Sequence, residues 1–245
     1  MGPAPQMLAQ WQHIVEHLAR QMDDPAKFMQ QVVRLYGTGE YSEDELHLRD
    51  GRIISRRSVP FKCEGEDFGR IWIYTDGTEA WNAKIDALTG LRNRRAYARY
   101  FPEFAQAADD GMIKAVAIMD LDNFKAYNDT YGHAAGDGVL RRIGALLSPP
   151  IVGDEMAFRI GGEEFLIACK NQTEGGVIAF FESIRSGLTT AAIPHSGNGS
   201  EKVVTASLGL ALFRGPQDPG SLFEAVDLAL YQSKSSGRNR MTLAH

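Results

Sequence analysis

The feature that most constrains the fold is a pair of glycines followed by a pair of glutamates, set between two apolar segments at residues 159–167. The flanking residues 155–160 and 165–169 have the pattern of short β-strands, and adjacent glycines permit a tight turn between them. We therefore predict a β-hairpin whose tip carries Glu163 and Glu164. A rigid hairpin holds carboxylates firmly enough to fix a metal ion, and the glycines let a bulky ligand approach the backbone.

A second acidic cluster follows the apolar residues 114–119, which run directly into Asp120, Leu121 and Asp122. An unbroken apolar run is typical of a buried central strand, and ligand sites of open sheets lie at the carboxyl ends of strands. We predict that Asp120 and Glu163 meet. Hard divalent ions such as Mg²⁺ prefer oxygen ligands, so these carboxylates and the Leu121 carbonyl would form a suitable set. The simpler alternative is that each acid only decorates a turn.

The order of the expected elements indicates an α/β (α+β) fold. It runs from a strand at 114–120 through helices up to 148, the hairpin, a helix at 174–190, a strand at 203–213, a helix at 221–236 and a last short strand. A β-α-β-β-α-β order fits ferredoxin-like and polymerase-palm folds, in which the acidic strand end lies beside the hairpin.

Five short motifs occur in a fixed order, at residues 86–94, 120–125, 128–137, 161–165 and 229–240. Together they resemble the GGDEF family of diguanylate cyclases, and five ordered motifs are far more specific than a single glycine turn. The resemblance implies synthesis of cyclic di-GMP from two molecules of GTP with release of pyrophosphate. It also implies a homodimer in which each subunit holds one GTP, because two loaded faces must meet.

The resemblance assigns the acidic residues to a metal site. Asp120 and Glu163 bind the ion through their side chains and Leu121 through its carbonyl, with Mg²⁺ as the ion and Mn²⁺ as a substitute. Glu163 also helps to deprotonate the attacking 3′-hydroxyl. Glu164 supports the site without binding the ion.

The resemblance also implies which residues bind the nucleotide. Asn128 and Asp137 recognise guanine, since a carboxylate can accept two hydrogen bonds from adjacent donors on that base. Lys125, Lys234 and Arg238 hold the triphosphate, and Lys125 also serves catalysis by stabilising developing charge. Taken singly, Lys125 would be a solvated helix residue, and Lys234 and Arg238 a basic helix end.

Two details bear on regulation and specificity. Relatives that are inhibited by their product carry an Arg-x-x-Asp motif before the hairpin, where this chain has Val152 and Glu155 as the outer residues. Arg159 alone is a poor replacement for that guanidinium, so we predict weak or no feedback inhibition through this site.

Relatives that make mixed cyclic dinucleotides replace the guanine-reading acid by a smaller hydroxyl residue. Asp137 therefore favours guanine on both sides.

We predict three segments: 1–78 as a partial PAS-like sensory or dimerisation segment, 79–85 as a helical connector and 86–245 as the GGDEF domain. An apolar stripe at residues 7–18 and a helix from Asp24-Pro25 to near Gly37 precede two strands around an Asp50-Gly51 turn and a third strand at 69–76. These strands resemble the later part of a PAS domain. Its early strands are not recognisable, so the domain is degenerate or the chain begins inside a longer protein.

Composition limits the other classes of function. With a net charge of -5 and a pI near 5.7, the chain is not expected to bind nucleic acid. It has no apolar run approaching the ~20 residues of a membrane span and no signal peptide, which predicts a cytoplasmic protein. The histidines at 13, 17 and 47 form no ligand cluster with the cysteines, so we assign no N-terminal cofactor and the signal ligand is unknown.

Two alternatives to a constitutive cyclase remain open. The chain could keep the fold as an inactive module that binds GTP or cyclic di-GMP. The N-terminal segment could also be a dimerisation device without which the catalytic domain is inactive.

Overall fold

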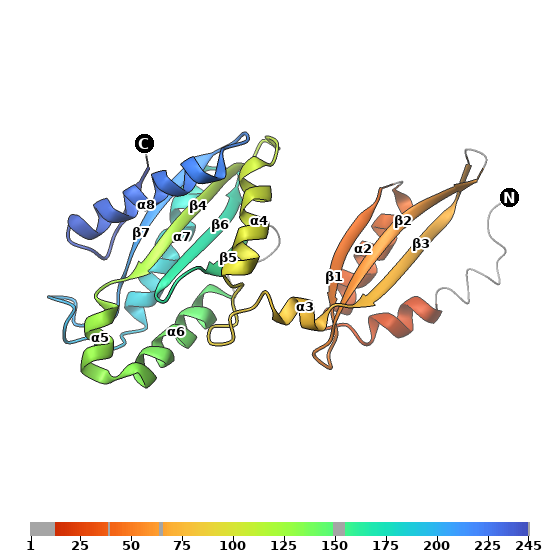
Figure 1. Ribbon diagram of the computed structural model, residues 1–245. Helices are drawn as coiled ribbons and strands as arrows, with labels where there is room; N and C mark the ends of the chain where they lie inside the picture. Colours follow the sequence, from red (N-terminus) through yellow and green to blue (C-terminus); the bar gives the residue numbers. More distant parts are fainter. Residues whose placement is uncertain (1–12, 39, 64–65, 149–154, 245) are drawn as a thin grey trace. The chain divides into compact units, whose positions relative to one another are not determined.

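The computed structural model describes residues 13–38, 40–63, 66–148 and 155–244. The chain divides into two compact units, Met1–Ala83 and Lys84–His245, and most of their elements are labelled in Figure 1. None of the helices in these described residues is long and apolar enough to cross a lipid bilayer.

The N-terminal unit contains an antiparallel sheet in the order β1-β2-β3. Its elements are α2 (Pro25–Gly37), β1 (Ser42–His47), β2 (Ile53–Cys63), β3 (Glu66–Asp76) and α3 (Thr78–Asn82), after a helical segment at 13–19. Asp24 caps α2 by accepting a hydrogen bond from the Lys27 N–H at 2.9 Å. The predicted second helix and the turn between the first two strands are thus confirmed.

The core of this unit lies between the helices and one face of the sheet. Its buried residues are Val15, Ala19, Met22, Phe28, Val32, Leu46 and Leu48. Of the predicted apolar stripe, Val15 is buried, Leu18 packs against the core, and Ile14 is 60% exposed; Met7, Leu8 and Trp11 lie outside the described residues. Three antiparallel strands with helices are common to many small α+β units, so the PAS resemblance stays a prediction.

The C-terminal unit contains the predicted split β-α-β-β-α-β arrangement. Its elements are α4 (Arg94–Gln106), β4 (Ile113–Leu121), α5 (Phe124–Tyr131), α6 (His133–Leu147), β5 (Met156–Arg159), β6 (Glu164–Asn171), α7 (Glu174–Thr190), β7 (Ala206–Phe213), α8 (Pro219–Ser235) and β8 (Met241–Leu243). The sheet has the order β5-β6-β4-β7-β8. Strand β4 runs antiparallel to both β6 and β7, and β8 runs parallel to β7. The α/β (α+β) ferredoxin-like expectation is confirmed.

Strand β4 is the centre of two hydrophobic layers because successive side chains of a strand point to opposite faces. Every residue of β4 is buried. Ala117 and Met119 pack in one layer with residues of α6 and α7, whereas Val116 and Ile118 pack in the other with α4 and α8. The apolar run that predicted this strand is therefore explained by helices on both faces.

Helix α8 approaches the sheet closely at Gly209 of β7. A Cβ at this position would lie 2.1 Å from the Val226 carbonyl oxygen and 2.4 Å from the Leu230 nitrogen, so the contact excludes every larger residue unless backbone moves. Ser233, near the end of the same helix, donates a hydrogen bond to the Leu208 carbonyl at 2.7 Å. These contacts fix the last turn of α8, which carries Lys234, against the end of the sheet.

Candidate active site

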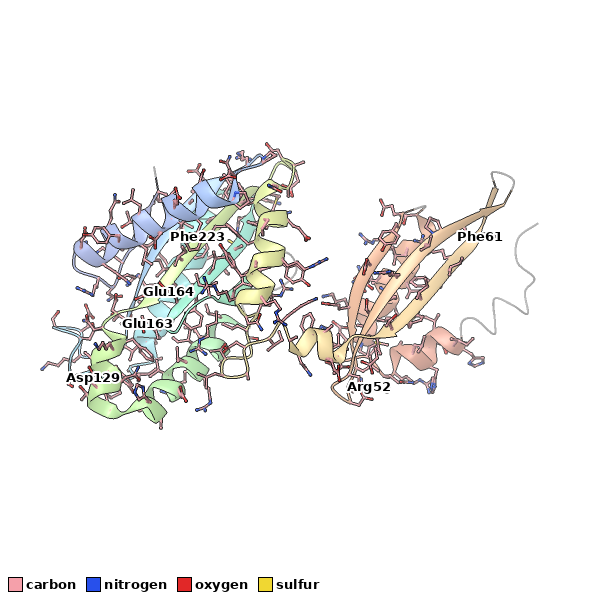
Figure 2. The ribbon with its side chains drawn as sticks, viewed as in Figure 1. Arg52, Phe61, Asp129, Glu163, Glu164 and Phe223 are labelled. Atoms are coloured by element: carbon pink, nitrogen blue, oxygen red, sulfur yellow. The ribbon has the colours of Figure 1, made fainter. Side chains whose placement is uncertain are left out.

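The two predicted acidic segments lie next to each other at one end of the sheet. Asp120 pairs with Glu164 in the β4–β6 register, and the Leu121 N–H donates to the Glu163 carbonyl at 3.3 Å. Figure 2 shows Glu163 and Glu164 at this end of the sheet. The predicted meeting of the strand end with the hairpin is therefore confirmed.

The carboxylates of this site are held in an unfavourable environment for negative charge. Asp120 is 6% exposed, and burial raises its pKa, an effect that Lys234 partly offsets and that Glu164 and Asp122 reinforce. Burial also raises the pKa of Glu163, and the charge of Asp120 raises it further. A cation between these groups would relieve both effects.

The donor set fits a magnesium site. Two carboxylates and the neighbouring Leu121 carbonyl are the oxygen ligands that Mg²⁺ takes when substrate phosphates complete its shell. Among the residues that the structure describes, no group of three or more His, Cys, Asp or Glu side chains is arranged to hold a metal by itself. Two carboxylates and one carbonyl leave further positions in the shell of such an ion for phosphate oxygens.

Lys234 forms an ion pair with Asp120 at the acidic strand end. Its Nζ lies 2.9 Å from Asp120 Oδ1, so in this structure the lysine pairs with the Asp120 carboxylate, whereas the resemblance implied a phosphate contact. Arg238 follows in the loop after α8 and is exposed, as is Lys125 in the first turn of α5. Exposed cations of this kind are available to a triphosphate at the end of the sheet.

The two predicted guanine-reading residues come from adjacent helices, Asn128 from α5 and Asp137 from α6. The Asn128 side chain crosses to α6 at Gly136, where an added Cβ would lie 1.9 Å from Asn128 Oδ1. Only glycine leaves this space. The structure thus brings the Asn128 amide beside the residue that precedes Asp137, and both side chains are half-buried.

Sequence reasoning missed what holds the hairpin tip. The Arg159 guanidinium donates to the Gly162 carbonyl at 2.8 Å and to both carboxylate oxygens of Asp86 at 3.0 and 3.2 Å. Asp86 also accepts from the Thr89 N–H and hydroxyl. Burial works to raise the pKa of Asp86, but these hydrogen bonds outweigh it and the net shift is downward. Of the predicted feedback positions, residues 152–154 lie outside the described residues.

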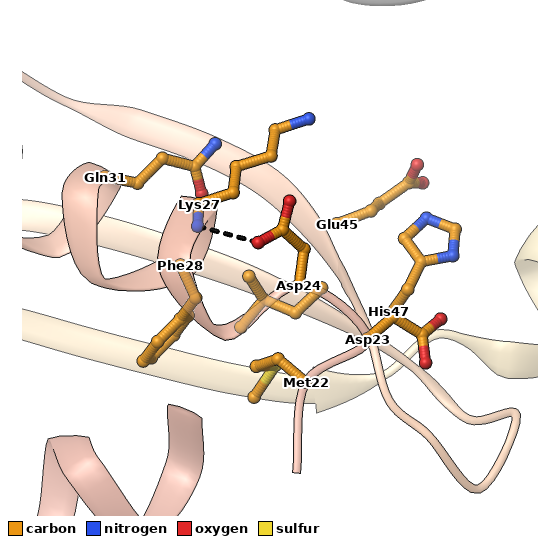
Figure 3. A pocket seen from close by; sticks show the side chains of 9 residues that line it. Met22, Asp23, Asp24, Lys27, Phe28, Gln31, Glu45 and His47 are labelled. Carbon is orange, nitrogen blue, oxygen red and sulfur yellow. Dashed lines mark hydrogen bonds between the residues drawn. The ribbon is translucent and has the colours of Figure 1, made fainter. Parts of the chain in front are cut away.

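The N-terminal unit has a pocket of its own, of about 310 Å³. Figure 3 shows its lining, in which Met22, Phe28 and Leu46 are buried and Asp23 and His47 are exposed. The dashed bond is the cap from the Lys27 N–H to Asp24. No residue that the sequence assigned to catalysis or to nucleotide binding lines this pocket.

Comparison with known proteins finds relatives of the C-terminal unit. The family described as "Diguanylate cyclase, GGDEF domain" matches residues 83–240. Diguanylate cyclase DosC of Escherichia coli K12 is 36% identical over 160 residues, which are 65% of this chain and 35% of DosC. Diguanylate cyclase DgcS of Shewanella oneidensis is 38% identical over 160 residues, which are 64% of this chain and 51% of DgcS. The chain thus spans about a third to a half of these relatives' length.

A solved structure shares the fold. The coiled coil and GGDEF domain of DgcB from Caulobacter crescentus, in complex with c-di-GMP, matches with a TM-score of 0.61 and 32% sequence identity. The match covers 68% of this chain and 88% of that structure.

Proposed function

Because the chain belongs to the GGDEF family, we propose that it is a diguanylate cyclase that joins two molecules of GTP into cyclic di-GMP and releases two of pyrophosphate. The observation that carries the proposal is that Asp120 lies beside the hairpin that carries Glu163 and Glu164. Lys234 Nζ lies 2.9 Å from the Asp120 carboxylate. Asp120 is buried and Glu163 half-buried, and two carboxylates brought together out of water are costly unless cations pair with them, which makes the pair a candidate ligand site. The two relatives described above, DosC and DgcS, are both named as diguanylate cyclases.

Asp120, Glu163 and the Leu121 carbonyl would hold Mg²⁺, with Mn²⁺ as a substitute. When bound, the ion supplies positive charge next to the α-phosphate. Lys125, Lys234 and Arg238 neutralise the triphosphate, and Lys234 is already fixed beside Asp120. Glu164, which pairs with Asp120 in the β4–β6 ladder, would support the metal site without binding the ion.

The proposed reaction is a nucleotidyl transfer. Asn128 and Asp137 orient guanine, and the Asp137 carboxylate accepts from the ring N–H and the amino group of that base. Glu163 helps to take the proton from the attacking 3′-hydroxyl, whose oxygen bonds to the α-phosphorus while the bond to pyrophosphate breaks. The proton passes to Glu163, and the negative charge leaves with pyrophosphate.

The proposal requires a homodimer, because the attacking hydroxyl belongs to the GTP on the second subunit. We propose that residues 1–78 form the sensory or dimerisation segment, with the PAS-like character suggested by their strands, and that residues 79–85 connect it to the domain at 86–245. Helix α3, Thr78–Asn82, overlaps this connector. The predicted cytoplasmic location belongs to this proposal as well, and it names no signal ligand for the N-terminal segment.

The test is to incubate the purified protein with GTP and Mg²⁺ and to separate the products by chromatography, with Glu163→Gln as the control. Cyclic di-GMP and pyrophosphate from the wild type alone are the expected result. Absence of product under every condition that promotes dimers, with GTP still bound, would replace the cyclase by the inactive binding module.

A further inference from the structure

Asp122 is a carboxylate buried at the end of the central strand. It is 1% exposed and comes two residues after Asp120. Its oxygens accept from the Thr205 hydroxyl at 2.7 Å, the Ser207 hydroxyl at 2.7 Å and the Asn239 N–H at 3.0 Å. All three donors are neutral, and a buried carboxylate is tolerated only when such bonds replace water.

The Asn239 N–H belongs to a loop in an unusual conformation. Arg238 has a φ of 61° and Asn239 a φ of 46°, so two successive non-glycine residues adopt the left-handed region. This region is unfavourable for an ordinary side chain such as that of Arg238, although asparagine tolerates it better. It persists only where the surroundings determine the backbone, which is common beside functional sites.

Asn239 is held from two sides. Asp122 accepts from its N–H, and Arg185 of α7 donates to its carbonyl at 3.2 Å and to its side-chain oxygen at 2.8 Å. The Arg238 N–H donates to the Ser233 carbonyl at 3.0 Å, which joins the loop to α8. The position of Arg238 relative to the end of β4 therefore depends on contacts that Asp122 and Arg185 make with the next residue.

We propose that Asp122 is a positioning residue for the triphosphate of GTP: by anchoring Asn239 it fixes Arg238 at a set distance from the Asp120 carboxylate. The proposal rests on the phosphate role assigned to Arg238 above. Asp122 does not act as a further metal ligand, because its two oxygens already accept three hydrogen bonds and the group is almost completely buried.

The test compares binding of a non-hydrolysable GTP analogue with binding of guanosine, together with steady-state kinetics. Asp122→Ala should raise the KM for GTP about tenfold, change kcat by less than about threefold and leave guanosine affinity unchanged. Asp122→Asn keeps an acceptor for the Asn239 N–H and should restore most of the GTP affinity. In an Arg238→Ala background, Asp122→Ala should add nothing further, since both changes remove one contact.

A second variant covers the case in which Asp122→Ala does not fold. Arg185→Ala removes the other anchor of Asn239 from a side chain that is 24% exposed, and it should raise the KM for GTP in the same way. Glu182→Ala removes only the ion pair of Arg185 at 2.8 Å and is the matched control, with an unchanged KM.

Three outcomes would overturn the inference. These are equal losses of GTP and guanosine affinity in Asp122→Ala, a wild-type KM in both Asp122→Ala and Arg185→Ala, or a changed Mg²⁺ requirement in Asp122→Asn that Arg238→Ala does not share. If Arg238→Ala itself leaves the KM for GTP unchanged, the phosphate role in the proposed function fails instead. The two failures are therefore distinguishable.

Discussion

The most direct test of guanine recognition is a one-carbon change at Gly136. A methyl group there would lie 1.9 Å from Asn128 Oδ1, 3.0 Å from its Cγ and 3.2 Å from Phe124 Cζ, where ordinary contacts begin at 3.4 Å. The obstacle is mainly the end of a flexible side chain, so the Asn128 amide must swing away while the backbones of α5 and α6 stay in place.

Two opposing effects determine how Gly136→Ala changes the free energy of unfolding, and the lost contact of Asn128 determines the change in the KM for GTP. Alanine is more favourable than glycine inside a helix by about 1 kcal/mol, which offsets the cost of moving Asn128, so we expect the free energy of unfolding to change little. A lost amide hydrogen bond to guanine costs about 0.5–1.5 kcal/mol, which corresponds to a roughly 2- to 13-fold higher KM for GTP. Gly136→Ala should therefore fold normally and bind GTP weakly.

The assay is the initial rate of cyclic di-GMP formation against GTP concentration, with urea unfolding of the same samples. Gly138→Ala is the matched control, because it lies on the same helix and an added Cβ would meet nothing within 4 Å. It should gain stability and keep the wild-type KM. Equal KM values for the two variants, or a large loss of stability in Gly136→Ala, would refute the assigned position of Asn128.

Three further predictions concern neighbouring groups. Glu163→Gln should lower kcat at least about 100-fold, measured by product chromatography, because it removes a metal ligand and a proton acceptor; Glu164→Gln should lower it less. Since the pKa of Asp86 is lowered, its carboxylate stabilises the fold above an unfolded pKa of about 3.9, and this contribution disappears as pH falls through the lower folded value. Asp86→Asn should thus unfold at lower urea than the wild type at pH 7, and the gap should close at lower pH; a gap independent of pH would contradict the assignment. Added cyclic di-GMP should inhibit initial rates weakly or not at all, and potent noncompetitive inhibition that persists in Arg159→Ala would count against the argument from Val152 and Glu155.

The sequence was sufficient for the parts of the site that local patterns determine. The apolar run before Asp120 predicted a central strand because helices cover both faces of β4. The two glycines before Glu163 predicted a turn, and β5 pairs with β6 across it as a hairpin. Strand β4 and the hairpin then lie side by side by the connection rules of the fold, which brings Asp120 opposite Glu164.

The contacts that fix the site join residues too far apart for local reasoning. Arg159 and Asp86 are 73 positions apart, and Asp122 and Asn239 are 117. The one available signal for Asp122 was the pair Thr205 and Ser207, polar residues two positions apart at the start of an apolar strand. Their shared face of the strand indicated a buried polar partner, but no pattern in the sequence named it.

Asp120 and Glu163 in their ionised forms destabilise the ligand-free fold, and this cost is our argument that the pair binds a ligand. Raised pKa values mean that folding disfavours the ionised forms of Asp120 and Glu163, and Lys234 offsets only part of that effect. A chain selected for stability alone would place neutral groups here. Glu163→Gln should therefore leave the ligand-free melting temperature at neutral pH unchanged or raise it while activity is lost. A lower melting temperature would mean that Glu163 serves the fold, and the argument from burial to metal binding would then lose its basis.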